Sequence, residues 1–227
     1  MSKLIEDIVD WDIVNWKKAI NYWEKNIELK MKSYSCLELG SNKGGLSLWL
    51  ALNGNNVICS DLVSPIETAS PLHKKYNCEV KINYASINAT NIVHSNQFDL
   101  VVFKSILGGI SRDGKNELKQ KTIQEIYNSL KPGGKLLFAE NLEASFLHKF
   151  LRKKFVKWGD AWNYLKYDEI TALFDCFQKV DFITVGFFGA FGRSEKQRNI
   201  LGEIDTIFGW LIPKKKRYIV VGIAEKK

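Results

Sequence analysis

The stretch "YSCLELGSNKGGLSLWLALNG" (residues 34–54) decides how this chain folds. A short apolar run comes first, the glycine-rich loop "GSNKGG" (40–45) follows, and an apolar, helix-like segment continues from it. This order is typical of a nucleotide-binding βα turn, in which glycines let the backbone turn tightly and approach a ligand closely. The sequence therefore predicts a strand over 34–39 and a helix over 44–53.

Strand and helix patterns alternate along the rest of the chain. Apolar or alternating runs predict strands, and apolar residues spaced three and four apart predict helices. This alternation favours a parallel sheet with helices on both faces. Further strands are predicted over 56–62, 79–87, 98–106, 135–142, 180–188 and 217–226, and further helices over 5–29, 65–76, 115–130, 144–157, 168–177 and 194–210.

Length and composition indicate an ordinary globular domain. The chain has 227 residues, no run approaching ~20 apolar residues and no signal-peptide core at its N-terminus, so no membrane span is expected and the cytoplasm is the expected location. The cysteines are scattered singly without metal-ligand spacing. We expect them to be reduced and structural, with no metal site: Cys36, Cys59, Cys78 and Cys176.

The net charge of +8 is concentrated in three segments, 148–157, 192–198 and 213–217. Positive fields attract phosphates, acidic sugars, nucleic acid or anionic membranes. A lysine-rich surface that only interacts with water is an equally good interpretation. Charge alone therefore predicts an anionic partner without choosing one.

An acidic residue follows the glycine-rich loop at an informative distance. Asp61 ends the second predicted strand, about twenty residues on, where a carboxylate accepts hydrogen bonds from both hydroxyls of a ribose. This favours an adenosine-type ligand. The loop reads G-x-N-x-G-G rather than the dinucleotide pattern G-x-G-x-x-G, and no Gly-Lys-Ser/Thr follows, which excludes a P-loop.

Five segments resemble, in order and spacing, the motifs of class I S-adenosylmethionine-dependent methyltransferases, in particular the small type 11/12-like members. The resemblance implies a seven-stranded Rossmann-like sheet, mostly parallel with an antiparallel last strand and helices on both faces. It also implies S-adenosyl-L-methionine as the cofactor. The segments are "CLELGSNKGGLSLWLALNG" (36–54), "VICSDL" (57–62), "SINATNI" (86–92), "FDLVVFKSILGGI" (98–110) and "LKPGGKLLFAENL" (130–142).

The resemblance assigns cofactor contacts residue by residue, with two departures from the family pattern. Asn42 stands where the family has a glycine, and asparagine is the residue after glycine that best tolerates a left-handed backbone. Asn88 stands where an acid is common, and its carbonyl oxygen still accepts a hydrogen bond from an adenine amino group. The cofactor-binding residues implied are Glu38, Gly40, Ser41, Asn42, Gly44, Asp61, Leu62, Asn88, Ala89 and Lys104.

The predicted catalytic residues follow the fourth and fifth strands. An alcohol or phenol acceptor usually needs a base, and His148 and Glu140 are candidates. A lone histidine is more often structural, and Glu140 is equally suited to capping a helix. Lys104 is expected to bind the cofactor carboxylate or an acidic substrate, unless it is an ordinary surface lysine.

One methyltransferase domain is expected over 1–227. Its parts are an N-terminal helical lid (1–30), a cofactor-binding half (31–142) and a substrate-side half (143–227) with a helical insertion near 190–212. Three tryptophans of the N-terminal segment either line the acceptor site or dock the segment on the core: Trp11, Trp16 and Trp23.

The leading functional hypothesis is O-methylation of a small molecule or glycan precursor, which can be acidic. RNA methylation is the first alternative because the chain is basic, although no appended RNA-binding module is visible. A non-catalytic cofactor-binding partner subunit is the second. The chain reads "FKSI" after the fourth strand, where base N-methyltransferases tend to have "NPPY". The sequence predicts no oligomeric state.

Overall fold

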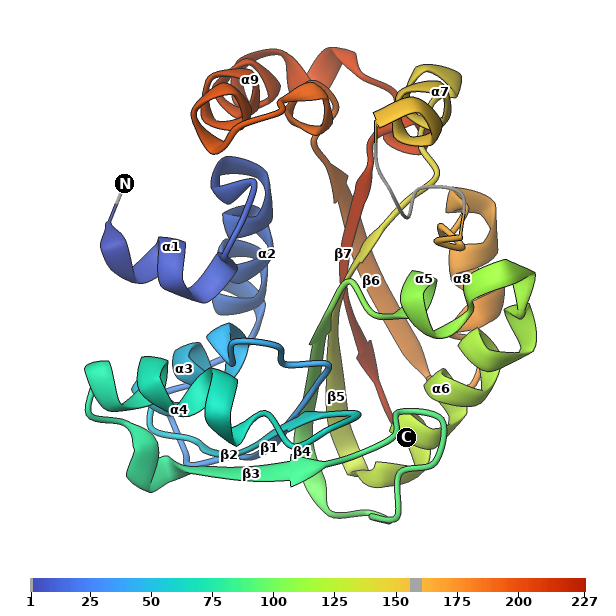
Figure 1. Cartoon of the computed structure of the whole chain (residues 1–227). Coiled ribbons are helices and arrows are strands. Elements are labelled where there is room, and N and C mark those ends of the chain that lie inside the picture. The colour runs from blue at the N-terminus through green and yellow to red at the C-terminus, as the bar shows by residue number, and fades with distance from the viewer. Residues whose placement is uncertain (1, 156–160) are drawn as a thin grey trace.

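Seven strands form one sheet in the order β3-β2-β1-β4-β5-β7-β6 in the computed structural model, which describes residues 2–155 and 161–227 (Figure 1). β7 runs antiparallel to both of its neighbours, and the remaining pairs are parallel. This confirms the predicted mostly parallel sheet with an antiparallel last strand. The strands are β1 (Ser35–Leu39), β2 (Asn56–Asp61), β3 (Ile82–Ser86), β4 (Phe98–Lys104), β5 (Leu130–Asn141), β6 (Lys179–Val185) and β7 (Ile219–Glu225).

Helices cover both faces of the sheet (Figure 1). Apolar residues of α1 to α4 pack on one face and those of α5, α6 and α8 on the other. The central strands are buried on both faces, which is why their sequences are apolar rather than alternating. The helices are α1 (Lys3–Val9), α2 (Ile13–Asn26), α3 (Gly45–Leu52), α4 (Ile66–Lys75), α5 (Leu107–Ile110), α6 (Asn116–Ser129), α7 (Phe146–Phe155), α8 (Ile170–Leu173) and α9 (Glu195–Phe208).

α7 and α9 lie together at one end of the molecule (Figure 1). α7 follows the carboxyl end of β5, and α9 precedes β7, which starts at that same edge of the sheet because it is antiparallel. A short 3₁₀ turn, η4 (Gly189–Phe191), contacts both helices. In open α/β sheets ligands bind beyond this edge, so α7 and α9 border the predicted site.

The predicted N-terminal helix over 5–29 is two helices. Asp10 and Asp12 separate α1 from α2. Their φ angles of 75° and 46° are positive, whereas a right-handed α-helix requires negative φ angles. Trp16 and Trp23 of α2 are buried in the core, so these two tryptophans dock the helix. Trp11 lies in the break between the helices and is only partly buried.

Smaller differences concern element ends. The predicted strand over 79–87 begins with a 3₁₀ turn, Glu79–Lys81, and the predicted helix over 168–177 is only α8 after a second turn, Tyr167–Glu169. The last residues of the basic segment 148–157 lie outside the described part of the chain. No helix in residues 2–155 or 161–227 combines the length and apolar character needed to cross a bilayer.

Candidate functional site

The loop between β1 and α3 makes the tight turn that the sequence predicts. Gly40 and Gly44 have φ of 65° and 73°, and Asn42 between them has φ of 49°. Glycine adopts such left-handed conformations freely, and asparagine tolerates them better than other residues. Asn42 therefore takes the conformation expected of a glycine substitute.

Helix α1 lies directly over this loop. A Cβ atom at Gly45 would lie 2.1 Å from the carbonyl oxygen of Ile8, so the close approach requires glycine. An ion pair of 2.7 Å joins Lys43 of the loop to Asp10 at the end of α1. α1 thus forms one wall of a cavity whose floor is the loop.

Glu38 lies next to the last residue of β1 and holds the start of α3. Its Oε2 accepts hydrogen bonds from the backbone N–H of Ser47, at 2.8 Å, and from the Ser47 hydroxyl. Burial raises the pKa of Glu38 to about 7. The carboxyl group also lines the cavity, where it can face a cationic group.

Asp61 lies beside the loop, as the sequence predicts. One carboxylate oxygen accepts a hydrogen bond from the backbone of Asn42 at 3.0 Å, and the other accepts one from the backbone of Leu62 at 2.7 Å. The sheet brings the carboxylate and the loop together because β1 and β2 are adjacent parallel strands. Each oxygen keeps acceptor capacity for a ligand hydroxyl.

The predicted adenine contacts lie on the next loop of the same sheet edge. Asn88 follows β3 and is exposed, and its side-chain oxygen accepts hydrogen bonds from the backbone and hydroxyl of Thr90, at 3.0 and 2.8 Å. Ala89 is partly buried and Leu62 is exposed. Their roles toward adenine stay predictions.

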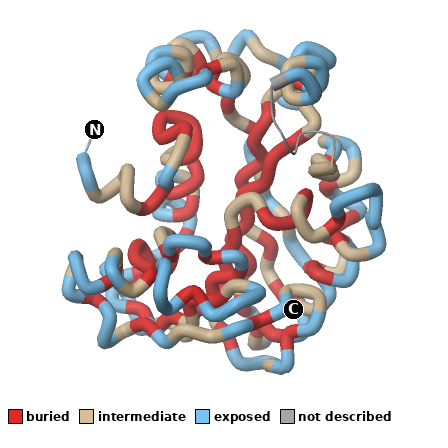
Figure 2. The backbone as a smooth tube through the Cα atoms, in the orientation of Figure 1, coloured by how far each residue is buried: buried red, intermediate tan, exposed pale blue. Residues whose placement is uncertain are grey.

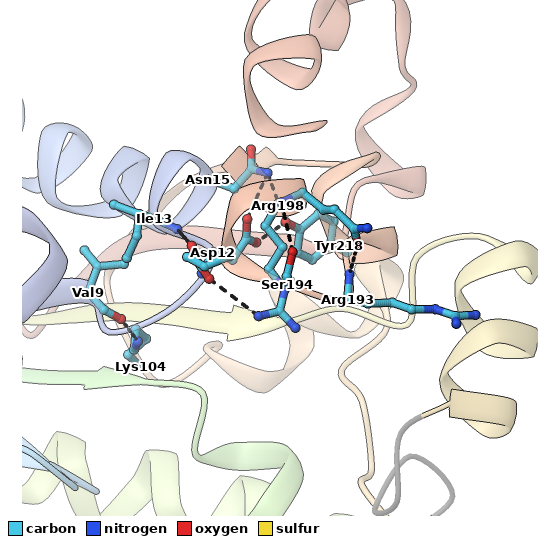
Figure 3. A network of polar contacts seen from close by, with 11 residues as sticks. Val9, Asp12, Ile13, Asn15, Lys104, Arg193, Ser194, Arg198 and Tyr218 are labelled. Carbon is cyan, nitrogen blue, oxygen red and sulfur yellow. Dashed lines mark hydrogen bonds and ion pairs between the residues drawn. The ribbon is translucent and has the colours of Figure 1, made fainter. Parts of the chain in front are cut away.

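Lys104 is not a surface lysine. Its Nζ donates a hydrogen bond to the carbonyl oxygen of Val9 (Figure 3). The same atom lies 5.7 and 5.3 Å from the ring centroids of Trp11 and Trp16. Burial lowers the pKa of the ammonium group to about 8, although Asp10 and Glu38 oppose this shift. The side chain therefore brings a readily neutralised cation into the site.

Two adjoining cavities meet beyond the ends of β4 and β5. The first, of about 190 Å³, lies among the loop, α1 and the end of β4. The second, of about 480 Å³, extends toward α7 and α9. Trp11 and Ser105 line both, so they mark the junction. Lining the first cavity are Asp7, Ile8, Asp10, Trp11, Glu38, Gly40, Ser41, Asn42, Lys43, Gly45, Leu46, Lys104 and Ser105.

The second cavity is aromatic and positively charged. Arg152 lies 4.1 Å from the ring centroid of Tyr164 and donates a hydrogen bond of 2.8 Å to the carbonyl oxygen of Leu142. Arg198 lies 5.8 Å from the ring centroid of Trp11. None of the described lining residues carries a carboxyl group or an imidazole: Trp11, Ser105, Asn141, Arg152, Trp162, Tyr164, Ala190, Arg198 and Tyr218.

His148 is buried with both ring nitrogens engaged. Nδ1 is 2.7 Å from the Ser145 hydroxyl, and Nε2 is 2.9 Å from the carbonyl oxygen of Phe187, to which it must donate. Burial lowers the pKa of the imidazole to about 4. In this arrangement neither nitrogen is free to accept a substrate proton, which matches the structural alternative for this histidine.

Glu140 is also committed to backbone groups. Its two oxygens accept hydrogen bonds from the backbone of Leu107 at 2.7 Å and of Asn141 at 2.8 Å, and the side chain is fully buried. Burial raises the pKa of Glu140 to about 7. The residue caps the short helix α5, in agreement with its capping alternative, and it does not line either cavity.

A polar network that the sequence did not reveal supports the wall of the second cavity (Figure 3). The Tyr218 hydroxyl donates to Asp12 and accepts a hydrogen bond of 3.0 Å from Asn15, which also donates to Asp205 at 3.0 Å. Asp205 in turn accepts three backbone hydrogen bonds from the turn at 187–189. These residues are far apart in sequence, so no local pattern predicts the network.

Comparison with known proteins identifies the central part of the chain. Residues 37–138 match a family described as "Methyltransferase domain". This range contains the loop, Asp61, Lys104 and the predicted adenine contacts. No curated protein sequence matches the chain.

Solved structures share the fold at low identity. A SAM-dependent methyltransferase from Methanosarcina mazei is 19% identical with a TM-score of 0.62, covering 86% of this chain and 93% of that one. Phosphoethanolamine N-methyltransferase 2 of Haemonchus contortus, crystallised with S-adenosyl-L-methionine, is 17% identical with a TM-score of 0.65, covering 98% and 56%, so this chain spans about half of that protein. The cyclase SpnF is 14% identical with a TM-score of 0.65, covering 92% and 80%.

Proposed function

Since residues 37–138 belong to the methyltransferase-domain family and the chain has the fold of class I S-adenosylmethionine-dependent methyltransferases, we propose that this protein methylates a small acidic acceptor on oxygen, using S-adenosyl-L-methionine. The observation that carries the proposal is the junction of the two cavities at Trp11 and Ser105. The first cavity suits the cofactor and the second suits an anionic acceptor. The two ligands would be in contact at the junction, as direct methyl transfer requires.

Residues of the first cavity fit the cofactor. The hydroxyl oxygen of Ser41 is buried without a hydrogen-bond partner among the described residues, which is unusual unless a ligand supplies one. Glu38 would face the ammonium group. Asp61, which contacts the loop at Asn42 but does not line this cavity, would accept hydrogen bonds from the ribose hydroxyls. Lys104 would bind the carboxylate. When bound, S-adenosyl-L-methionine supplies a methyl group on a sulfonium centre.

Arg152 and Arg198 suit an acidic acceptor in the second cavity. The volume of about 480 Å³ is that of a small-molecule pocket. Two guanidinium groups beside aromatic rings hold a carboxylate, phosphate or ionised hydroxyl, because arginine stays charged and stacks on rings. Positive charge also lowers the pKa of an acidic acceptor group, so its proton passes to water before the methyl transfer and no protein base is needed. This agrees with the lack of carboxyl and imidazole groups among the described residues that line this cavity.

The other wall of the junction positions the acceptor. The Asn141 side-chain amide donates a hydrogen bond to the hydroxyl of Ser105, whose backbone has a φ of 59°. A non-glycine residue in this conformation is strained and often marks a functional site. We infer that Ser105 and Asn141 orient the acceptor oxygen, and that the aromatic rings exclude water.

A methyl-transfer assay tests the proposal. Purified protein is incubated with cofactor carrying a radioactive methyl group and with paired acceptors, each a carboxylic acid, acidic phenol or acidic sugar together with its neutral isostere. Bulk RNA is a further substrate. We expect label in acidic small molecules and little in their neutral partners. Label found only in RNA, or binding of cofactor without transfer to any acidic compound, would contradict the proposal.

Cofactor affinity is expected to fall as the pH rises through about 8. Only the ammonium form of Lys104 attracts the cofactor carboxylate, and its pKa without ligand is about 8. Below this pH the contribution of Lys104 is constant, while Glu38, with a pKa of about 7, loses its proton there and attracts the ligand ammonium group more strongly. Above pH 8 the affinity should decrease by up to about tenfold per pH unit. Calorimetric titration with S-adenosylhomocysteine between pH 6.5 and 9.5 measures this.

The variant Lys104→Met is the control for that pH dependence. It should bind S-adenosylhomocysteine weakly at every pH between 6.5 and 9, because no cation remains to titrate. If the variant kept the slope of the original protein, the titration would belong to another group and the role given to Lys104 would be wrong.

A further inference from the structure

Large apolar side chains are exposed on α7 and on the segment formed by α9 and the turn Gly209–Leu211. Figure 2 shows exposed residues along both helices. Trp210 is 77% exposed and Phe146 is 80% exposed. Large exposed apolar residues that gather at one end of a molecule indicate an interaction surface. α7 and α9 lie at the same end, and both contact η4 (Figure 1). The exposed apolar residues of this surface, the α7–α9 face, are Phe146, Leu147, Phe150, Ile200, Ile207, Phe208, Trp210 and Leu211.

Helix packing leaves these residues on the outside. α9 rests on α2 through Gly202, where an added Cβ would lie 2.6 Å from the Val14 side chain. Ile200 and Ile207 are two turns apart and lie on the opposite side of the helix from Gly202. On α7, the buried His148 faces the protein while Phe146 and Phe150, four apart, face outward. No described residue covers either stripe of apolar side chains.

The surroundings of these stripes are strongly basic. Residues 146–155 contain four lysines and arginines and no acidic residue, and residues 193–217 contain seven basic and three acidic residues. The run Lys214 to Lys216 begins three residues after the exposed Leu211, and all three lysines are exposed. Aromatic and aliphatic side chains next to lysines are typical of helices that lie in a membrane interface.

We propose that the α7–α9 face docks this protein on an anionic lipid bilayer, with Trp210 and Phe150 inserted among the headgroups. Charge complementarity to anionic lipid selects this partner. The aliphatic residues Leu147, Ile200 and Ile207 favour lipid over RNA, because they have no ring to stack on a base. The docking itself is independent of the proposed function, whereas the route for an acceptor rests on it.

Docking in this way brings the bilayer to the acceptor site. A third cavity, of about 550 Å³, lies between α7 and η4, and it shares Arg152, Ala190 and Arg198 with the second cavity. The two docking helices therefore border the route into the arginine-lined cavity. An amphipathic acceptor with an acidic head group reaches Arg152 and Arg198 from the interface while its apolar part stays in the lipid.

Vesicle sedimentation tests the docking surface. The full chain is mixed with two kinds of vesicle. One kind is phosphatidylcholine alone, and the other is phosphatidylcholine with roughly 30% phosphatidylglycerol, which gives a strongly negative surface. We expect binding to the anionic vesicles that weakens as salt is added. Changing Lys214, Lys215 and Lys216 to glutamine should lower the partition coefficient by roughly 100-fold, since each lysine near a surface contributes about fivefold.

Matched variants separate docking from general effects. The double variant Trp210→Ala and Phe150→Ala should lower partitioning by at least about tenfold, whereas Val80→Ala with Val93→Ala should not, although these valines are 88% and 83% exposed. Glutamine at Lys25, Lys30 and Lys32, near the end of α2 remote from α9, controls for total charge. Circular dichroism confirms that each variant is folded.

Three outcomes would overturn the proposal. The first is equal binding to neutral and anionic vesicles, or no binding to either. The second is binding that the control variants reduce as much as the test variants do. The third is that the α7–α9 variants instead abolish binding to polyuridine or dissociate a dimer seen by sedimentation velocity. Each outcome would assign this face to another partner.

Discussion

Replacing Asp61 with alanine is expected to weaken the binding of S-adenosylhomocysteine by about 100-fold or more. In the proposed binding mode the carboxylate accepts hydrogen bonds from two ribose hydroxyls, and a hydrogen bond to a charged group contributes about 1.5–3 kcal/mol. Isothermal titration calorimetry at pH 7, below the range where Lys104 loses its charge, measures the change. Equal affinity of the variant and the original protein would remove the ribose assignment.

The control for this experiment must account for the structural role of Asp61. The same carboxylate accepts backbone hydrogen bonds from Asn42 and Leu62, so the alanine variant also loosens the loop. Asp99 offers a matched case, because it accepts a backbone hydrogen bond of 2.8 Å from Ser35 and pairs with Lys131 at 3.0 Å, at the opposite edge of the sheet. Asp99→Ala should lower the melting temperature and leave cofactor affinity unchanged.

Replacing Arg198 with methionine is expected to lower kcat/KM for an acidic acceptor by about 100-fold. A hydrogen bond to a charged group contributes about 1.5–3 kcal/mol, and the variant removes the one that the guanidinium would give the acceptor. Glu195, which pairs with Arg198 at 3.5 Å, also loses its partner. The loss should appear mainly as a higher KM, since the arginine binds the acceptor before and during transfer. Steady-state kinetics at saturating cofactor, with an acidic acceptor from the paired panel and its neutral isostere, measures it.

The specificity of that loss is what tests the second cavity. Lys196 lies on the same helix as Arg198 and does not line the second cavity. Lys196→Met therefore removes one positive charge near the site and should leave kcat/KM unchanged. Arg198→Lys should recover part of the rate, because lysine keeps the charge without the planar fork. If Arg198→Met slowed acidic and neutral acceptors equally, the guanidinium would support the wall of the cavity rather than bind an anion.

The shared fold does not decide the chemistry by itself. A methyltransferase and the cyclase SpnF both align with more than four-fifths of this chain at TM-scores above 0.6. Function resides in the site that a fold carries. For this reason the acceptor class is argued from Arg152, Arg198 and the lining of the second cavity, and not from any neighbour.

The cofactor side was predictable because its signals are local. The loop over 40–45 needs left-handed backbone at defined positions, and only glycine or asparagine satisfies this at low cost. Asp61 lies at the end of β2, and adjacent parallel strands bring such ends together regardless of the rest of the chain. Lys104 at the end of β4 reaches the same edge for the same reason.

The catalytic candidates were less predictable, because a side chain's role depends on its partners. His148 and Glu140 have suitable chemistry and suitable positions along the chain, yet Phe187 and Leu107 occupy the atoms that a substrate would need. No pattern within a few residues of either side chain contains this information. Arg198, which the resemblance did not assign, enters the site only because α9 folds back over α2.

By itself, the sequence determined the succession of strands and helices along the chain and the edge of the sheet at which the glycine-rich loop and Asp61 lie, since periodicity and glycine positions act over a few residues. The antiparallel last strand was expected only from the family resemblance. Tertiary structure alone decided that the N-terminal helix breaks at Asp12. There the Glu195 carboxylate, 183 residues away, accepts hydrogen bonds from the backbone of Asp12 and Ile13. It also decided that the second cavity is lined by arginine, because contacts between distant segments follow from the packing of the whole chain.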